Sequence, residues 1–442
     1  MNILLCYGKH PFTTGEFIEK SLRKYFNVFS CGTVLNGAKH DLTITDPYID
    51  IYSLIKSLDF KPDLVFFIES GVEFFPINID KIKVPTIYYS IDAHFNYNWQ
   101  KNYFYLFDYA FITFRQFIDR VSEFIDYTPI YLPHGYDSSI YFYKNEKKDI
   151  NISFVGDLSR KNRLKLINKL KKYDIKIYTN IWGEEVRKIY SRSKLVLNDN
   201  TFGVLNPRNF EASSCRSVVL ANPAVDLENF FKDNESIIIY NSIEELDKKV
   251  DFLLKNSELL DKIAKKAQEV AFLNTWDKRI ESVRDKFFSF KEKREKSFAK
   301  LSYALMFLKR GIYSKSYEFL QVLLKENPNN FIVLISLAKL YLNIGDYKNA
   351  EIYLEKAKSL NSEHFNVLFL DALLTLNKDI NKGIDKLLKI NDKYKDYDVK
   401  YILSLFFLNS QKNLSIKLLK EAIEIDPYRF EARDKLDEIL TT

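Results

Sequence analysis

The first 290 residues alternate short apolar runs with amphipathic stretches. Apolar runs predict buried strands at 2–6, 28–32, 63–70, 86–91 and 109–113, and again at 151–156, 175–179, 194–199, 217–222 and 236–240. Helical periodicity lies between them, for example at 15–26 and 96–107, and three helical patterns follow at 242–256, 257–274 and 277–290. This alternation favours two parallel sheets wrapped by helices, separated by a polar linker.

From about residue 298 the pattern becomes entirely helical and repeats every 34 residues. Small residues mark the period, since Ala338, Gly345 and Ala350 are preceded 34 positions earlier by Ala304, Gly311 and Ser316. Ala372 opens a third, slightly shorter unit, and a fourth ends with Ala422 and Pro427. The period and the small residues resemble the tetratricopeptide repeat (TPR), in which paired helices approach closely. Such arrays bind peptides or proteins, here on a surface that would include Asn343, Asn366 and Tyr401.

Composition narrows the possible functions only slightly. The chain has 442 residues, 46% of them hydrophobic, and a net charge of +7 from 66 basic and 59 acidic residues. This charge is too mild to indicate a nucleic-acid partner, but it suits an anionic small ligand. Cys6, Cys31 and Cys215 lie far apart, so the sequence predicts neither a zinc site nor a disulfide framework. Because the N-terminal apolar run is short, we expect no signal peptide, no transmembrane segment and a cytoplasmic location.

The sharpest motif is "NPRNFEASSCRSVVLANP" at 206–223, where Arg208 precedes Glu211 by three positions at the start of a short helix. Together with the two α/β parts, it resembles the nucleotide-sugar glycosyltransferases of the GT-B fold, most closely the spore-maturation-protein (CgeB-like) type. "FVGDLSRKNRLKLINKL", "YSRSKLVLND" and "LPHGYDSSIYF" add to the resemblance, which extends over roughly residues 1–290. The expected fold is therefore α/β plus all-α, with two tandem Rossmann-like domains followed by a TPR-like helical array.

The resemblance also gives the domains their roles. It implies an acceptor-side domain at 1–137, a linker at 138–150 and a nucleotide-sugar-binding domain with its closing helices at 151–290. The helical repeats occupy 298–442. A sugar nucleotide is an anionic diphosphate joined to a ribose, which arginine forks and helix N-termini bind well. Glu211 takes the ribose in this view, and Arg208 and Arg163 take the phosphates. The expected donor-binding residues are Gly15, Gly156, Lys161, Arg163, Trp182, Asn198, Arg208 and Glu211.

Candidate general bases stand in the first domain, where Asp92 and His94 follow a predicted strand. One feature departs from many retaining relatives, because Gly203 occupies the position eight residues before Glu211 where they carry a second glutamate. We expect no metal and no other cofactor, because arginines can neutralise the departing diphosphate.

A purely structural role is the alternative interpretation for several of these residues. Arg208 and Glu211 can form a surface ion pair, and Arg163 can belong to a solvated basic turn. Asp92 can cap a helix, and Trp182 can anchor the core as well as stack on a base.

The sequence thus predicts a cytoplasmic bacterial glycosyltransferase that moves a sugar from a nucleotide-diphosphate sugar to an acceptor hydroxyl. The acceptor is expected on a protein, such as flagellin, docked by the TPR repeats. One alternative is a polysaccharide-building transferase whose repeats dock a partner enzyme. Another is a non-catalytic scaffold with a degenerate transferase fold.

Overall fold

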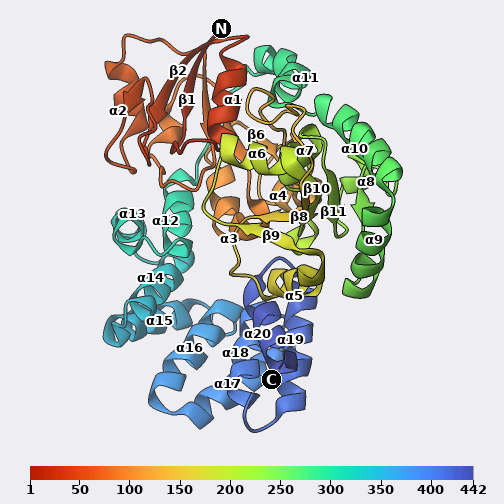
Figure 1. Ribbon diagram of the computed structural model, residues 1–442. Coiled ribbons are helices and arrows are strands. Elements are labelled where there is room, and N and C mark those ends of the chain that lie inside the picture. Colours follow the sequence, from red (N-terminus) through yellow and green to blue (C-terminus); the bar gives the residue numbers. More distant parts are fainter. Residues whose placement is uncertain (442) are drawn as a thin grey trace. The chain divides into compact units, whose positions relative to one another are not determined.

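The computed structural model describes residues 1–441 and contains two parallel sheets and a series of paired helices (Figure 1). All the strands predicted from apolar runs are present. The first sheet has the order β3-β2-β1-β4-β5-β6-β7. Its strands are β1 (Asn2–Cys6), β2 (Asn27–Gly32), β3 (Leu42–Thr43), β4 (Leu64–Ile68), β5 (Thr86–Ser90), β6 (Tyr109–Ile112) and β7 (Ile130–Tyr131). The sequence did not indicate β3 and β7, because two residues are too few to establish a periodicity.

Helices connect these strands, as parallel pairing requires. They are α1 (Thr14–Leu22), α2 (Ile51–Ser57), α3 (Ala93–Phe104) and α4 (Ile118–Ser122). The residues of β1, β4 and β5 are buried almost throughout, as expected for strands covered on both faces.

The second sheet has the order β12-β11-β10-β8-β9, and its described strand pairs are all parallel. Its strands are β8 (Ile150–Val155), β9 (Ile175–Tyr178), β10 (Ser193–Asn198), β11 (Val218–Ala221) and β12 (Ile238–Ile239). The accompanying helices are α5 (Lys161–Leu170), α6 (Glu184–Arg192), α7 (Arg208–Ser214), α8 (Leu227–Phe230), α9 (Ile243–Lys255) and α10 (Ser257–Phe272). In both sheets the strand order reverses beside the first strand, between β1 and β4 and between β8 and β10. Ligands of doubly wound sheets bind at such switch points.

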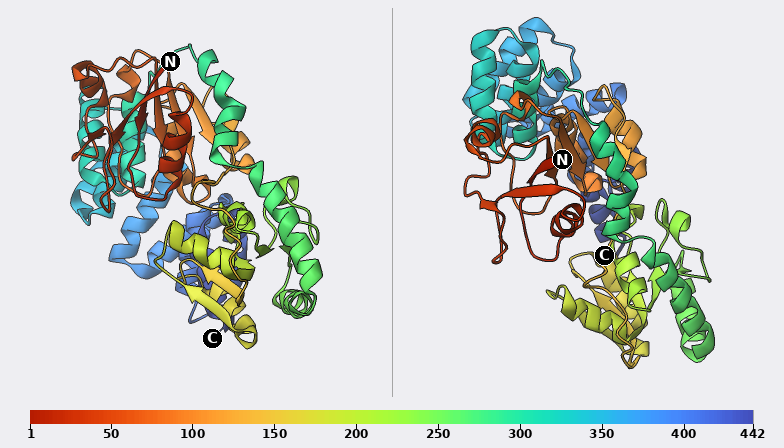
Figure 2. Two further views of the ribbon diagram at one scale, coloured as in Figure 1. Left: turned by 45° about the horizontal axis from the view of Figure 1, so that its top comes forward. Right: turned by 90° about the horizontal axis from the view of Figure 1, so that it is seen from above.

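Helix α11 (Trp276–Ser289) leaves the second α/β part and packs beside α1 of the first (Figure 1; Figure 2). The ring of Phe287 lies 5.3 Å from that of Phe26 and 5.7 Å from that of Phe66, and Asp277 accepts a hydrogen bond from Ser21. The segment after α11 is held by the buried Asp108, whose carboxylate accepts hydrogen bonds from the Lys293 ammonium and the backbone N–H of Arg294. The two α/β parts consequently share one compact unit.

The helical repeats form a second compact unit. Their helices are α12 (Ala299–Lys309), α13 (Tyr313–Glu326), α14 (Phe331–Asn343), α15 (Tyr347–Leu360), α16 (Phe365–Lys378), α17 (Ile380–Lys393), α18 (Tyr397–Phe407), α19 (Lys412–Ile425) and α20 (Phe430–Thr441). The fourth residue of the second helix in each pair is small and buried: Ser316, Ala350, Gly383 and Ser415. Each pair of helices can approach closely there. The predicted fold class is therefore confirmed.

Residues 94–106, most of helix α3, belong to the helical unit, which the sequence did not indicate. The guanidinium of Arg310 lies 4.8 Å above the ring of Trp99, and the backbone N–H of Phe298 donates to the hydroxyl of Tyr105. A separation at residue 298 would therefore remove the packing partners of α3. Along residues 1–441, no helix is both long enough and apolar enough to cross a membrane.

Candidate functional site

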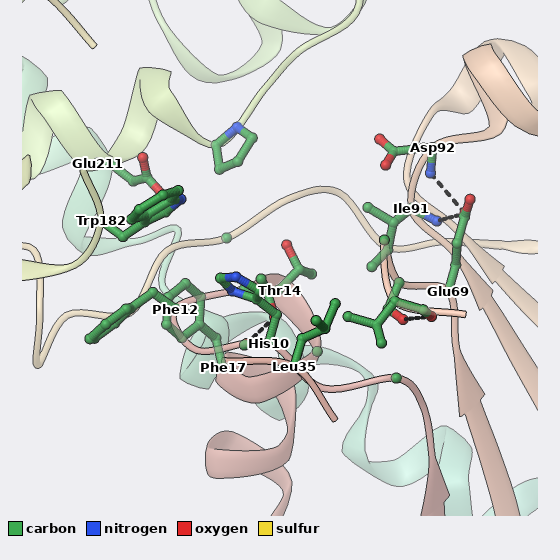
Figure 3. A pocket seen from close by; sticks show the side chains of 18 residues that line it. His10, Phe12, Thr14, Phe17, Leu35, Glu69, Ile91, Asp92, Trp182 and Glu211 are labelled. Atoms are coloured by element: carbon green, nitrogen blue, oxygen red, sulfur yellow. Dashed lines mark hydrogen bonds between the residues drawn. The ribbon is translucent and has the colours of Figure 1, made fainter. Parts of the chain in front are cut away.

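A cavity of about 450 Å³ lies at the carboxyl ends of β1 and β4, the switch point of the first sheet (Figure 3). The second α/β part completes its lining. Four of the predicted site residues line it together: Gly15, Asp92, Trp182 and Glu211. In Figure 3, Asp92 lies on one side of the cavity and Glu211 and Trp182 lie on the other.

Gly15 stands in the first turn of α1, where no side chain would fit. A Cβ at this position would meet the ring of Tyr7 at 2.6 Å. Tyr7 is itself fixed, because its hydroxyl donates a 2.5 Å hydrogen bond to the buried Glu19. The glycine thus allows the start of α1 to pack closely against Tyr7 at the edge of the cavity.

Asp92 follows β5 and directly precedes α3. Its backbone N–H donates to the carboxylate of Glu69 at 2.9 Å, and the N–H of Ile91 donates to the same oxygen at 2.7 Å. The Asp92 carboxylate accepts no hydrogen bond within the described chain, so the predicted helix-capping contact is absent there. Burial and the nearby Glu69 raise the pKa of Asp92 to about 7. A carboxyl group that titrates near neutral pH can accept a proton from a substrate.

Glu211 lies on α7, one turn after Arg208. No residue of the described chain donates a hydrogen bond to its carboxylate, which lines the cavity. Burial raises the pKa of Glu211 to about 7, although the positive charge of Arg208 acts in the opposite direction. Arg208 and Glu211 do not form a hydrogen-bonded ion pair, so the simple surface-pair reading does not describe this site.

Arg208 lies at the switch point of the second sheet, beside the ends of β8 and β10. Its Nη1 donates to Oδ1 of Asn198 at 2.8 Å. A Cβ on Gly156, the residue after β8, would lie 2.9 Å from its Nη2, and Gly156 has a φ of +149°. Among the described residues no carboxylate lies within salt-bridge distance of Arg208. The fold therefore places a guanidinium without a counter-ion against a bare glycine backbone.

Asn198 supports this arginine from within a buried asparagine cluster, and is itself fully buried. Its Nδ2 donates to Asn209 at 2.8 Å and to Asn200 at 3.0 Å, while its Oδ1 also accepts from Asn206 at 3.1 Å. A donor-binding role is predicted for Asn198, and in the structure its Oδ1 can hold Arg208 in position. A neutral cluster can do this without cancelling the charge of the guanidinium.

The other two predicted cations differ from Arg208. Arg163 on α5 donates to Asp199 at 3.2 Å and lies 3.7 Å from Asp157, and only 16% of its side chain is exposed. Its charge is therefore already balanced by carboxylates. Lys161 is the exposed first residue of α5. Neither residue is part of the cavity lining found in the described chain, and the same holds for Arg208, Gly156 and Asn198.

Trp182 is 51% exposed, so it does not anchor the core. Its ring lies 6.2 Å from that of His10, and both line the cavity. His94 differs from its neighbour Asp92. It is buried within α3, its ring lies 3.9 Å from that of Phe95, and the described lining of the cavity does not include it.

Sequence reasoning did not select Glu69, His10 or Phe12, all of which line the cavity. A usable signal existed for Glu69, since it is a carboxylate near the end of the predicted strand at 63–70, and β4 borders the switch point. His10 and Phe12 lie in an irregular segment after β1, where periodicity carries no information. In the described chain no three His, Cys, Asp or Glu residues gather into a group that could hold a metal ion.

Comparisons with known proteins agree with this architecture. The profile of the Glycosyl transferase-like family matches residues 145–285, and that of the Tetratricopeptide repeat matches residues 333–364. Among curated proteins no relative matches the chain. The chain thus contains a glycosyltransferase-like domain followed by a tetratricopeptide repeat.

Several solved structures resemble parts of the chain at low sequence identity. Anabaena Alr3699/HepE in complex with UDP is 11% identical, with a TM-score of 0.48, over 65% of this chain and 100% of that one. A glycosyltransferase from Rickettsia africae is 12% identical, with a TM-score of 0.49, over 65% and 98% of the two chains. The TPR protein TTC0263 from Thermus thermophilus is 16% identical, with a TM-score of 0.29, over 33% and 81%.

Proposed function

We propose that this protein is a glycosyltransferase that moves a sugar from a nucleotide-diphosphate sugar to an acceptor hydroxyl. The observation that carries the proposal is Arg208, a guanidinium without a carboxylate partner, held against Gly156 one turn before Glu211. A diphosphate supplies the missing negative charge, and a ribose diol supplies hydroxyl donors for the Glu211 carboxylate. The sequence "PRNFEA" around Arg208 further supports assignment to the spore-maturation-protein type.

Each residue then has a defined task. The acceptor oxygen attacks the anomeric carbon as the bond from that carbon to the diphosphate oxygen breaks. Asp92 takes the proton of the acceptor hydroxyl. Arg208 stabilises the negative charge that the departing diphosphate gains, which makes its contribution greatest in the transition state. Trp182, exposed in the lining of the same cavity, offers a flat surface to a bound ligand.

We further propose that transfer needs no metal ion. Diphosphate departure requires a positive charge near the bridging oxygen, and Arg208 supplies one that no carboxylate neutralises. Incubation with EDTA should leave the turnover rate unchanged. Restoration of a lost rate by added Mg²⁺ or Mn²⁺ would show that the proposal is wrong.

The repeats are proposed to dock the acceptor in the cytoplasm, on a protein such as flagellin. Asn343 and Asn366 are exposed residues of α14 and α16. Asn343→Ala and Asn366→Ala should raise KM for the protein acceptor without changing nucleotide affinity. If they instead abolish association with a second enzyme, the repeats serve a polysaccharide-building assembly. A protein that binds no sugar nucleotide at all would be a scaffold.

The direct test is a thermal-shift screen of nucleotide-sugars, followed by calorimetry. Uridine nucleotides come first, because the Anabaena structure was determined with UDP. A ligand at 100 times its Kd stabilises the folded state by about 2.7 kcal/mol. Glu211→Ala should weaken binding of the selected nucleotide about 10- to 30-fold, the loss of two hydrogen bonds. Unchanged affinity would exclude a ribose role for Glu211, and Glu258→Ala, at an exposed position on α10, serves as the matched control.

A further inference from the structure

A second cavity, of about 440 Å³, adjoins the first. The two share His10, Phe12 and Trp182, and the second also contains Asn36, Glu184 and Glu185 in its lining. Its volume lies within the range of small-molecule sites. None of the roles assigned above uses this second cavity.

Its apolar surface is aromatic and exposed. Phe12 is 44% exposed and Trp182 is 51% exposed, on two loops from different α/β parts. Phe12 has a φ of +61°, which is unusual for a bulky residue. The backbone N–H of Phe12 donates to Glu16 at 2.7 Å. The ring of Phe12 packs against Gly183, where an added Cβ would lie only 2.6 Å from the ring. The fold therefore holds an aromatic ring in the solvent in a strained conformation, which is typical of ligand sites.

Two polar groups of the second cavity are free hydrogen-bond acceptors. Asn36 donates from Nδ2 to Nε2 of His10 at 2.7 Å, which leaves its Oδ1 free in the described chain. The Glu185 carboxylate is exposed and has no partner there. Free acceptors favour a ligand rich in hydroxyl donors and disfavour phosphate or carboxylate groups.

The partly balanced charge of the second cavity favours a neutral polyol over a basic peptide as its ligand. Glu184 lies 3.8 Å from Lys188 and 3.7 Å from Arg187, so part of the negative charge at this cavity is already balanced. Flat aromatic faces match the C–H faces of a pyranose, and the remaining acceptors match its hydroxyls. A sugar ring meets both requirements at once.

We infer that the second cavity binds a sugar residue of the acceptor, whichever molecule carries it. This inference rests on the proposed function, and it names the acceptor class of the same site. The bound sugar would present a hydroxyl to the first cavity, where Asp92 takes its proton. An earlier sugar-transferring reaction must then supply the acceptor with its first sugar.

Tryptophan fluorescence can test the inference directly. The chain has three tryptophans, of which Trp99 and Trp276 are 7% and 1% exposed. Quenching by acrylamide therefore reports mainly on Trp182. The probes are methyl glycosides of glucose, galactose, mannose and N-acetylglucosamine, added to the full chain saturated with UDP. At least one glycoside should protect Trp182 from quenching.

Three variants sharpen the result. Glu185→Ala should weaken glycoside binding about fivefold, the effect of one lost hydrogen bond. Asn36→Gly should do the same, and glycine tolerates the φ of +51° at this position. Glu258→Ala, an exposed glutamate on α10, is the matched control and should bind the glycoside as the parent does. UDP affinity should be the same in all three.

Four outcomes would overturn the inference. These are the absence of protection by every glycoside, protection by N-acetyl-lysine amide alone, protection by uridine alone, and displacement of the glycoside by a UDP-hexose but not by UDP. The last would assign the sugar to the donor. Failure of the proposed transferase function looks different, because the glycoside would still protect Trp182 in a protein that no nucleotide stabilises.

Discussion

The α/β unit and the helical repeats bury polar side chains in different ways. In the repeats, most buried polar residues are serines whose hydroxyls donate to a helix carbonyl, such as Ser316 to Ala304 and Ser415 to Ser404, both at 2.8 Å. In the α/β unit, carboxylates and amides are buried at strand ends, among them Glu69 and Asn198. The serine contacts allow close packing of helices. Burial of a carboxylate or an amide costs more desolvation free energy, so its presence in the interior needs a further explanation.

The difference indicates where the chemistry lies. Asp92 and Glu211, on the two sides of one cavity, have a pKa near 7 and no hydrogen bond to either carboxylate in the described chain. A carboxyl group whose pKa is raised by folding lowers the free energy of unfolding once it is ionised. The protein therefore loses some stability at neutral pH by keeping these two carboxylates. The repeats have no comparable pair facing a described cavity.

Asp92→Asn should have the largest effect. If Asp92 is the general base, the variant should lose about 10²- to 10⁴-fold in turnover with little change in nucleotide affinity. The parent rate should rise as pH increases through about 7, where the Asp92 carboxyl group ionises. The measurement is initial rate against pH with saturating donor. An unchanged rate for Asp92→Asn would contradict the assignment, and Asp119→Asn on α4 provides a control outside the cavity lining.

Arg208 and Arg163 offer a comparison within one domain. Arg208→Ala should lower turnover about 100-fold, because its charge has no carboxylate partner and is available to the leaving diphosphate. Arg163→Ala should lower turnover much less, since Asp199 and Asp157 already balance its charge. Steady-state kinetics of both variants distinguish the cases. Equal losses would mean that Arg163 also reaches the phosphates and that its ion pairs open on binding.

The sequence predicted the architecture because strands and repeat helices have clear periods. The carboxyl-edge rule also led to Asp92, and the motif led to Arg208 and Glu211. The sequence could not show how the surroundings of Arg208 and Arg163 differ, since both residues follow strands in similar basic or polar contexts. Only the fold shows that Arg163 donates a hydrogen bond to the carboxylate of Asp199, 36 residues away in the sequence, whereas Arg208 donates to the amide of Asn198. Likewise, His94 stands two residues from Asp92 but does not share its cavity, because α3 begins between them.

Glu211→Gln should change the pH dependence of stability. The pKa of Glu211 is higher in the folded protein than in the unfolded chain, so the folded state binds more protons between about pH 4.5 and 7. Its contribution to stability is therefore present at low pH and is lost as pH rises toward 7. Glutamine carries no such charge. The variant and the parent should have the same free energy of unfolding at pH 4. At pH 8 the free energy of unfolding of the variant should be higher by ~1–3 kcal/mol, at ~1.4 kcal/mol per pKa unit.

Denaturant titrations at the two pH values measure this difference. Equal stability at pH 8 would show that the Glu211 carboxylate is well solvated. Glu258→Gln, at an exposed position on α10, should match the parent at both pH values.

The smallest effect on the site is expected from a change within the repeats. Gly383 lies on α17 against α16, and a Cβ there would meet the Cδ2 and Cα atoms of Leu376 at 2.5 Å and 2.7 Å. Gly383→Ala should therefore destabilise the helical unit by about 1–3 kcal/mol through overpacking. Nucleotide affinity by calorimetry should stay within about twofold, because Arg208 and Glu211 belong to the other compact unit. Asn381→Ala, an exposed change on the same helix, is the control. A parallel loss of affinity in Gly383→Ala alone would show that the repeats help to shape the site, and the contrast between the two units would then no longer hold.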